Sequence, residues 1–153
     1  MDLTIREDDL QGPEIIALLE QHLALMFSVS PPESVHALDL EGLRGQDVTV
    51  WTAWRRGRLL GCGALKELEP GHGEIKSMHT AAAFRGQGVG AAILLHLLDE
   101  ARGRGYRRVS LETGSMPTFA SARSLYRRHG FSTCPPFGDY ADDPNSVFMT
   151  RLL

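Results

Sequence analysis

The chain has 153 residues, the size of one ordinary domain, and we expect a single domain over residues 1–153. Its contents of 42% hydrophobic and 23% charged residues are typical of a globular protein with a buried core, which excludes a disordered, collagen-like or coiled-coil chain. The net charge of −3, from 16 basic and 19 acidic residues, argues against a general nucleic-acid binder.

Two cysteines, Cys62 and Cys134, are too few for a disulfide framework, and we expect both to be reduced. The N-terminal residues lack the basic and apolar segments of a signal peptide. The near-apolar stretch at residues 89–98 is too short to span a bilayer. These features predict a soluble cytoplasmic protein without a membrane anchor.

The first half of the chain contains strand and helix patterns in turn. A short strand at residues 3–6 precedes a helix that begins near Pro13, because proline is favoured at the first helical position. A second, shorter helix is expected from Ser30 toward Leu40. Three strands follow, at residues 48–55, 59–65 and 71–80, and the first two are joined by a tight turn at Arg56-Gly57.

The second half contains a helix between two strands. Residues 89–102 are apolar on most sides, which predicts a buried helix, and a strand at 108–113 follows it. Another helix is expected to begin after a Thr118 cap and to end at Gly130. With final strands at 131–134 and 146–152, this order predicts an α/β fold: a mixed, mostly antiparallel sheet of about six to seven strands with a central β-α-β unit and flanking helices.

The most informative segment is the glycine-rich stretch at residues 85–90, which lies between a strand and the buried helix. Its glycines allow the backbone to approach a ligand closely, and the N-terminus of the following helix attracts anions. A P-loop is excluded, because Ala91-Ala92 stands where lysine and serine or threonine are required. Gly86, Gly88 and Ala91 fit a dinucleotide fingerprint, but only 62 residues follow Ala91, too few for the remaining β-α units of a Rossmann fold.

The same stretch resembles the Q/R-x-x-G-x-G/A acyl-CoA loop of the GNAT N-acetyltransferase superfamily, with Arg85, Gly88 and Gly90 on the fixed positions. Residues 74–80 resemble the fourth strand of that family, and the element order matches most closely over residues 48–135. The family's A-x-x-L-Y-x-x-x-G-F stretch is matched by Ala122, Leu125, Tyr126, Gly130 and Phe131.

The resemblance implies the GNAT fold and an enzyme that transfers an acetyl group from acetyl-CoA directly to a primary amine of a small molecule. Acetylation of a protein or peptide amine is an alternative, as is a CoA-binding sensor domain without turnover. No metal, nucleic acid or membrane partner is expected, and a homodimer is a reasonable expectation for a small enzyme.

The resemblance also implies site residues by position. Tyr126 is implied as the acid that protonates the departing CoA thiolate, and Phe119 stands where many members carry an asparagine that contacts pantetheine. Backbone groups near the end of the fourth strand are implied to bind pantetheine and to polarise the thioester, where a β-bulge would free N–H groups. The implied cofactor residues are Met78, His79 and Thr80 on this strand and Arg85, Gly86, Gln87, Gly88, Val89 and Gly90 in the pyrophosphate loop.

Several carboxylates are candidates for the acceptor side of the reaction. Glu74 and Glu112 are both candidates for the base that takes the amine proton, because they lie on consecutive strands that could face one cleft. The histidines have no metal-ligand spacing, and His72 and His79 are expected on opposite faces of one strand because their separation is odd. Candidate substrate residues are Asp39, Glu41 and Tyr140, in acidic segments that would attract a cationic amine.

Overall fold

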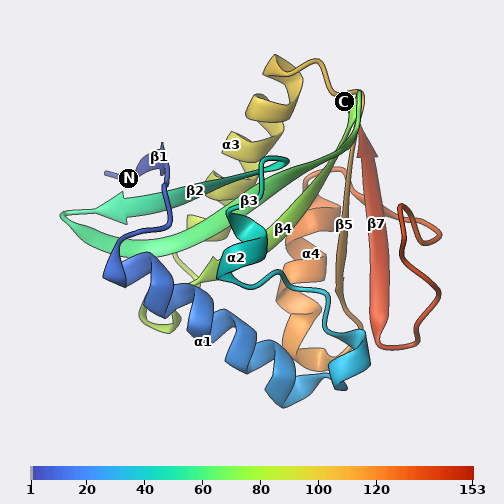
Figure 1. The fold of residues 1–153 in the computed structure, drawn as a ribbon, viewed down its shortest axis with the longest axis horizontal. Coiled ribbons are helices and arrows are strands. Elements are labelled where there is room, and N and C mark those ends of the chain that lie inside the picture. The colour runs from blue at the N-terminus through green and yellow to red at the C-terminus, as the bar shows by residue number, and fades with distance from the viewer. Residues whose placement is uncertain (1) are drawn as a thin grey trace.

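The computed structural model describes residues 2–153, which form one seven-stranded sheet with helices on both faces (Figure 1). The strands are β1 (Thr4–Glu7), β2 (Val48–Arg55), β3 (Arg58–Glu69), β4 (His72–Thr80), β5 (Arg108–Gly114), β6 (Ser132–Thr133) and β7 (Ser146–Leu152). The helices are α1 (Pro13–Val29), α2 (Leu40–Leu43), α3 (Val89–Gly103) and α4 (Ala120–Arg128).

The strand order is β1-β2-β3-β4-β5-β7-β6, in which β4 and β5 are parallel and all other neighbours are antiparallel. The turn between β2 and β3 has positive φ at both Arg56 (+52°) and Gly57 (+74°), as the favoured two-residue hairpin turn requires. The mixed, mostly antiparallel sheet, the hairpin and the central β4-α3-β5 unit predicted from the sequence are therefore confirmed.

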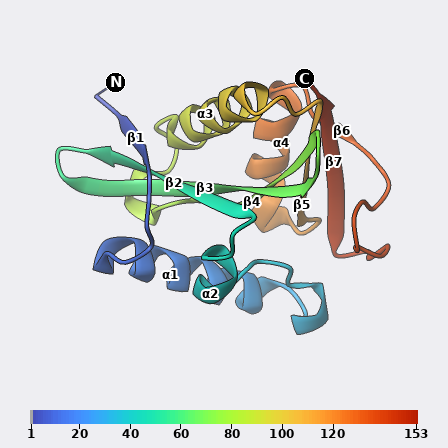
Figure 2. The ribbon, with the colours of Figure 1, turned by 45° about the horizontal axis from the view of Figure 1, so that its top comes forward.

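Helices cover both faces of this sheet, with α3 and α4 on one face and α1 and α2 on the other (Figure 2). The apolar character of α3 predicted a buried helix, and six of its residues are buried in the core beneath it. A second core lies under α1 and α2. None of the helices in residues 2–153 combines the length and apolar character needed to cross a membrane. The buried α3 residues are Val89, Ile93, Leu94, Leu97, Leu98 and Ala101.

The helix predicted from Ser30 toward Leu40 is wrong. A single 3-10 turn (Pro32–Ser34) is followed by irregular chain, and α2 begins only at Leu40. Consecutive prolines restrict the preceding residues to extended conformations, which stops a helix from continuing through them. The side chain of Asp39 accepts a hydrogen bond from the N–H of Gly42 at 2.8 Å, and this cap starts a new helix instead.

The predicted Thr118 cap is also wrong. A 3-10 turn occupies Pro117–Phe119, so Thr118 lies inside a helical turn and cannot be its cap. Phe119 takes the cap position of α4 without a side-chain hydrogen bond. The helix that was expected to begin after Thr118 therefore begins at Ala120.

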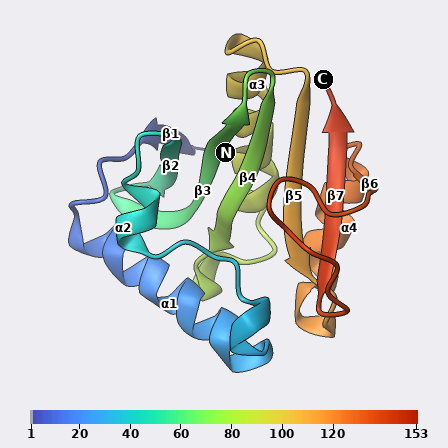
Figure 3. The same cartoon turned by 45° about the vertical axis from the view of Figure 1, so that its right-hand side comes forward.

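Strands β4 and β5 separate in their second halves. Their pairing covers only His72–Ile75 and Arg108–Leu111, although β4 continues to Thr80 and β5 to Gly114. Figure 3 shows the two strands diverging on this side of the sheet. Backbone groups on the facing edges beyond Ile75 and Leu111 are therefore not used by β4–β5 pairing.

A β-bulge interrupts β4 within this divergent half. Between Lys76 and His79, which pair in register with β3, the two residues Ser77 and Met78 lie opposite the single residue Gly63. Ser77 has a φ of +54°, a conformation that non-glycine residues rarely adopt. A bulge at the end of this strand is what would free N–H groups for the thioester, and β4 has one at Ser77–Met78.

The bulge changes the alternation of side chains along β4. An extra residue moves the side chains of all later strand residues to the other face of the sheet, because side chains alternate between the faces with a period of two. His79 therefore faces α1, where its ring lies 4.8 Å from that of His22. The prediction that His72 and His79 lie on opposite faces, made from their odd separation, is wrong for this reason.

Candidate active site

Two adjoining pockets lie beside the divergent half of β4. The α3 groove, of about 380 Å³, follows the N-terminus of α3 and one face of α4. The β4–β5 pocket, of about 100 Å³, lies between these two strands and is bordered by the chain after α1 and by Tyr140. Six residues line both pockets and form the passage between them: His22, Met26, Met78, Phe119, Ala122 and Tyr126.

The α3 groove contains the predicted anion site. Gly86 and Gly88 have positive φ (+76° and +83°), so the loop adopts a conformation that favours glycine and leads directly into α3. The unpaired N–H groups and the positive dipole end of α3 favour a phosphate group there. Arg85 adds a cation, and its Nε donates to the carbonyl oxygen of Thr80 at 3.3 Å.

Eight of the nine predicted cofactor residues line the α3 groove. Gln87 is the exception, because its side-chain oxygen accepts a hydrogen bond from Nη2 of Arg55 at 3.0 Å. Burial lowers the pKa of His79 to about 4, and the charge of Arg85 contributes. Burial similarly lowers the pKa of His22 to about 4. Both imidazoles are therefore neutral at pH 7.

A polar cluster occupies the β4–β5 pocket. Oε2 of Glu74 accepts hydrogen bonds from Nζ of Lys76 at 3.1 Å and from the hydroxyl of Tyr140 at 2.5 Å. Nζ of Lys76 also donates to the Tyr140 oxygen at 3.0 Å. The side chains of Lys76 and Glu74 are only 7% and 4% exposed, so this ion pair is buried. The cluster balances the charge of Glu74 within the pocket.

Glu112 lies in the same pocket on β5, so the structure brings both candidate bases together. Burial raises the pKa of Glu112 to about 7, although the neighbouring Lys76 charge opposes this change. A carboxyl group that titrates near neutral pH is suited to exchange protons during a reaction. Glu74, by contrast, is engaged with Lys76 and Tyr140.

Tyr126 of α4 is a buried phenol in the passage between the pockets. Burial raises its pKa, and the nearby carboxylate of Glu112 raises it further. The ring is held edge-on against Phe131, with centroids 5.8 Å apart. The phenol therefore remains protonated at neutral pH and can serve as a proton donor.

Phe119 forms an apolar wall of the passage. Its ring lies over Gly114, where a Cβ atom would collide with the ring carbons. This packing explains how a large aromatic side chain is accommodated at the position where the resembled family often carries asparagine. Gly114, the last residue of β5, has no side chain and so leaves the space that the Phe119 ring occupies.

Not all of the predicted substrate residues join the site. Tyr140 lines the β4–β5 pocket, whereas Asp39 caps α2 and Glu41 is exposed on that helix, and neither lines the α3 groove or the β4–β5 pocket. Sequence reasoning missed several lining residues, because they come from segments without a motif. These are His22 of α1, Ser34 and His36 of the following chain, Ser77 of the bulge and Asn145 before β7.

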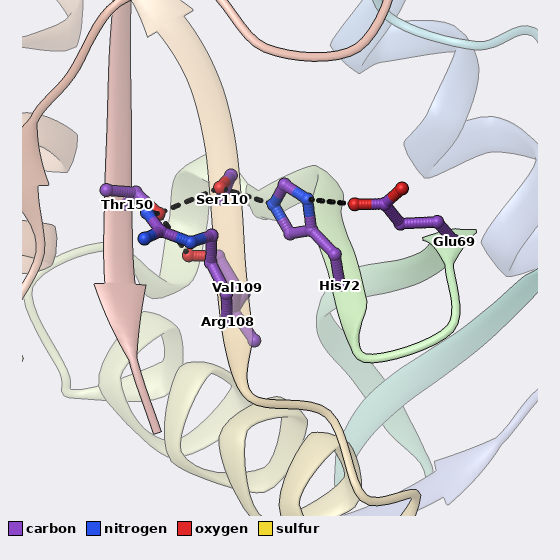
Figure 4. A network of polar contacts seen from close by, with 6 residues as sticks. All are labelled: Glu69, His72, Arg108, Val109, Ser110 and Thr150. Atoms are coloured by element: carbon purple, nitrogen blue, oxygen red, sulfur yellow. Dashed lines mark hydrogen bonds and ion pairs between the residues drawn. The ribbon is translucent and has the colours of Figure 1, made fainter.

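A separate polar network crosses the sheet outside both pockets (Figure 4). Nε2 of His72 lies 2.7 Å from Oγ of Ser110, which lies 2.9 Å from Oγ1 of Thr150. Nδ1 of His72 faces Glu69 at 3.9 Å. Ser110 is buried and lines neither pocket, so this serine-histidine-glutamate series lies outside the candidate site and links neighbouring strands. Over residues 2–153, no three His, Cys, Asp or Glu side chains gather as a metal site.

Comparison with known sequences identifies relatives along nearly the whole chain. The sequence profile of the acetyltransferase (GNAT) family matches residues 16–131. YsnE of Bacillus subtilis, an uncharacterized N-acetyltransferase, is 55% identical over 97% of this chain and 99% of its own length. The IAA acetyltransferase of Azospirillum brasilense is 38% identical over 97% of this chain and 95% of its own length.

Solved structures share the fold. A protein from Klebsiella pneumoniae, whose name places it among the acyl-CoA N-acyltransferases, is 32% identical and superposes with a TM-score of 0.81 over 99% of this chain and 97% of its own. A GNAT family acetyltransferase from Elizabethkingia anophelis with acetyl-CoA bound is 18% identical and superposes with a TM-score of 0.69 over 99% of each chain.

Proposed function

The chain belongs to the acetyltransferase (GNAT) family and is an acetyl-CoA-dependent N-acetyltransferase, and we propose that its acceptor is a primary amine of a small molecule. The observation that carries the proposal is the junction of the α3 groove with the β4–β5 pocket, where Tyr126 and Glu112 come together. In this proposal the pyrophosphate of acetyl-CoA binds at the loop before α3, and the acceptor occupies the β4–β5 pocket.

The chemistry begins with removal of a proton from the acceptor. A simple alkyl amine is mostly protonated at pH 7, because its pKa is about 10, and it must lose a proton to become a nucleophile. Glu112 is suited to take this proton, because burial places its pKa at about 7. The nitrogen then attacks the thioester carbon, and in this proposal the N–H groups at the Ser77–Met78 bulge stabilise the oxyanion.

Collapse of the tetrahedral intermediate breaks the carbon–sulfur bond. Tyr126 donates its phenolic proton to the departing CoA sulfur, which leaves CoA and an amide whose nitrogen still carries an extra proton. That proton passes to the Tyr126 phenolate, and Glu112 releases the first proton to water. Two protons thus leave the ammonium group, one replaces the proton that Tyr126 gave to the thiol, one reaches the solvent, and the enzyme is restored. The electrostatic influence of Glu112 on the pKa of Tyr126 supports a short path between them.

The pocket supports a small acceptor rather than a folded protein. Its volume of about 100 Å³ accommodates only a few heavy atoms around the amine. Oγ of Ser34, which lines the pocket, donates to Oδ2 of Asp143 at 2.5 Å. This hydrogen bond joins the chain after α1 to the loop before β7. The carboxylate of Glu112, once ionised, favours a cationic group over an anion.

The acceptor class is tested by following CoA release with a panel of acceptors. The panel contains ethylamine, ethanolamine, putrescine, benzylamine, free amino acids, a short peptide with a free N-terminus and IAA, the compound in the name of one relative. We expect turnover with at least one small primary amine, and mass spectrometry should show a product 42 Da heavier. Turnover with the peptide alone, or with none of the amines, would contradict the proposal.

We expect the Gly88→Ala variant to bind acetyl-CoA roughly tenfold more weakly, because a side chain at φ +83° destabilises the loop conformation by about 1–2 kcal/mol. Calorimetric titration with acetyl-CoA measures the change, and NAD serves as the control ligand that should not bind. Gly57→Ala is the matched variant, since Gly57 has a similar φ of +74° in the remote β2–β3 turn. An unchanged affinity in Gly88→Ala would remove the loop from the binding site.

A further inference from the structure

Ser77 is the extra residue of the β4 bulge and has an unusual backbone conformation. Its φ of +54° lies in the left-handed region, which a side chain other than that of glycine, asparagine or aspartate rarely occupies. Such strain persists only where the surrounding structure enforces it, and it concentrates at functional sites. Glycine would relieve the strain, yet the chain carries serine at this position.

The hydroxyl of Ser77 is buried without a partner. The residue is 7% exposed, and within residues 2–153 its Oγ makes no hydrogen bond. Its main-chain carbonyl oxygen, by contrast, accepts a hydrogen bond from Sγ of Cys62 at 3.3 Å. A buried hydroxyl that makes no hydrogen bond destabilises a folded protein, so alanine would be the more stable choice in the absence of a ligand.

The position of Ser77 indicates which ligand atoms it meets. Ser77 lines the β4–β5 pocket but not the α3 groove, whereas the next residue, Met78, lines both. It therefore lies on the acceptor side of the point where the two substrates meet. The neighbouring polar side chains of that strand, Glu74 and Lys76, are hydrogen-bonded to each other and to Tyr140.

We propose that the hydroxyl of Ser77 binds the acceptor amine, with its Oγ accepting a hydrogen bond from the amine N–H. This proposal rests on the proposed function. A hydroxyl oxygen has two acceptor lone pairs, and no group in residues 2–153 donates a hydrogen bond to this one. The bond holds the nitrogen beside the bulge, so that its lone pair points toward the thioester carbon after Glu112 has taken a proton.

Two substitutions separate the hydroxyl from the backbone strain. Ser77→Ala removes the hydroxyl and retains a side chain at positive φ, whereas Ser77→Gly removes the hydroxyl and relieves the strain. For the panel amine that the wild type acetylates fastest, we expect both variants to lose roughly tenfold or more in kcat/KM. The KM for acetyl-CoA should stay within about twofold, and the melting temperature of Ser77→Ala should equal or exceed that of the wild type.

Ser110→Ala is the matched control for a buried serine. Ser110 is hydrogen-bonded to both His72 and Thr150 (Figure 4) and lines neither pocket. Its removal leaves buried polar partners unsatisfied, so the melting temperature should fall while kcat/KM for the amine is retained. The two serines are thus expected to give opposite results. Ser77→Ala should keep its melting temperature and lose kcat/KM, whereas Ser110→Ala should keep kcat/KM and have a lower melting temperature.

Three results would overturn the assignment. An unchanged kcat/KM in Ser77→Ala would show that the hydroxyl does not contact the amine, and a loss confined to Ser77→Gly would assign the effect to the backbone. An equal loss of the slow hydrolysis of acetyl-CoA without amine would place the hydroxyl on the thioester instead. If the wild type binds acetyl-CoA but acetylates no amine of the panel, the proposed function itself is overturned. This outcome is seen in the wild type alone, whereas the three results above are seen only by comparing the Ser77 variants with it.

Discussion

The Tyr126→Phe variant is expected to lose about 10²–10⁴-fold in kcat while its affinity for acetyl-CoA is retained. The phenol lies in the passage between the pockets, and burial together with the Glu112 carboxylate raises its pKa, so it is protonated when the thiolate departs. Phenylalanine keeps the ring and its edge contact with Phe131, and removes only the proton donor. Steady-state kinetics and calorimetric titration measure the two quantities.

Tyr106 provides the matched control for this substitution. It is also a buried tyrosine, 6% exposed, but its hydroxyl donates to Oε1 of Glu67 at 3.1 Å and it lines neither pocket. Tyr106→Phe should therefore leave kcat unchanged. A Tyr126→Phe variant with wild-type kcat would show that another group, or water, protonates the thiolate.

The Glu112→Gln variant is expected to lose about 10²-fold or more in kcat and to lose the acidic limb of the pH profile. In the wild type the base works only when ionised. Since burial raises the pKa of Glu112 to about 7, kcat at saturating amine should fall tenfold per pH unit below that value and level off above it. Glutamine cannot titrate, so the residual rate of the variant should not show this limb.

The raised pKa of Glu112 also makes stability depend on pH, in the opposite direction to kcat. A carboxyl group whose pKa is higher in the folded than in the unfolded protein binds more protons when folded between pH 4.5 and about 7, so the free energy of unfolding decreases as pH rises through this range. Urea unfolding of Glu112→Gln should lack this decrease, and at pH 8 the variant should be at least as stable as the wild type.

Glu74→Gln distinguishes the two carboxylates. Glu74 is the buried partner of Lys76, so glutamine there leaves a lysine charge unbalanced and should lower stability. Its kcat profile should keep the acidic limb near pH 7. If the limb disappears in Glu74→Gln and persists in Glu112→Gln, the base is Glu74 and not Glu112.

The sequence alone determined the local features whose causes lie within a short stretch of chain. The glycines before Val89 predicted the anion-binding loop, because the backbone there requires positive φ and a helix follows directly. The apolar pattern of α3 predicted a buried helix, which the structure confirms. Two motifs at a fixed separation then predicted the family, which the matching profile confirms.

Tertiary structure decided which groups meet and in what electrostatic environment. Tyr140 donates a hydrogen bond to Glu74, 66 positions away in sequence, and so engages that carboxylate. Glu112 on the neighbouring strand is buried, and burial raises its pKa to about 7. The bulge at Ser77 likewise depends on the pairing of β4 with β3, which changes the side on which every later residue of β4 lies. Pairing partners, burial and pKa depend on contacts between distant segments, and the order of residues along the chain does not contain them in any local pattern.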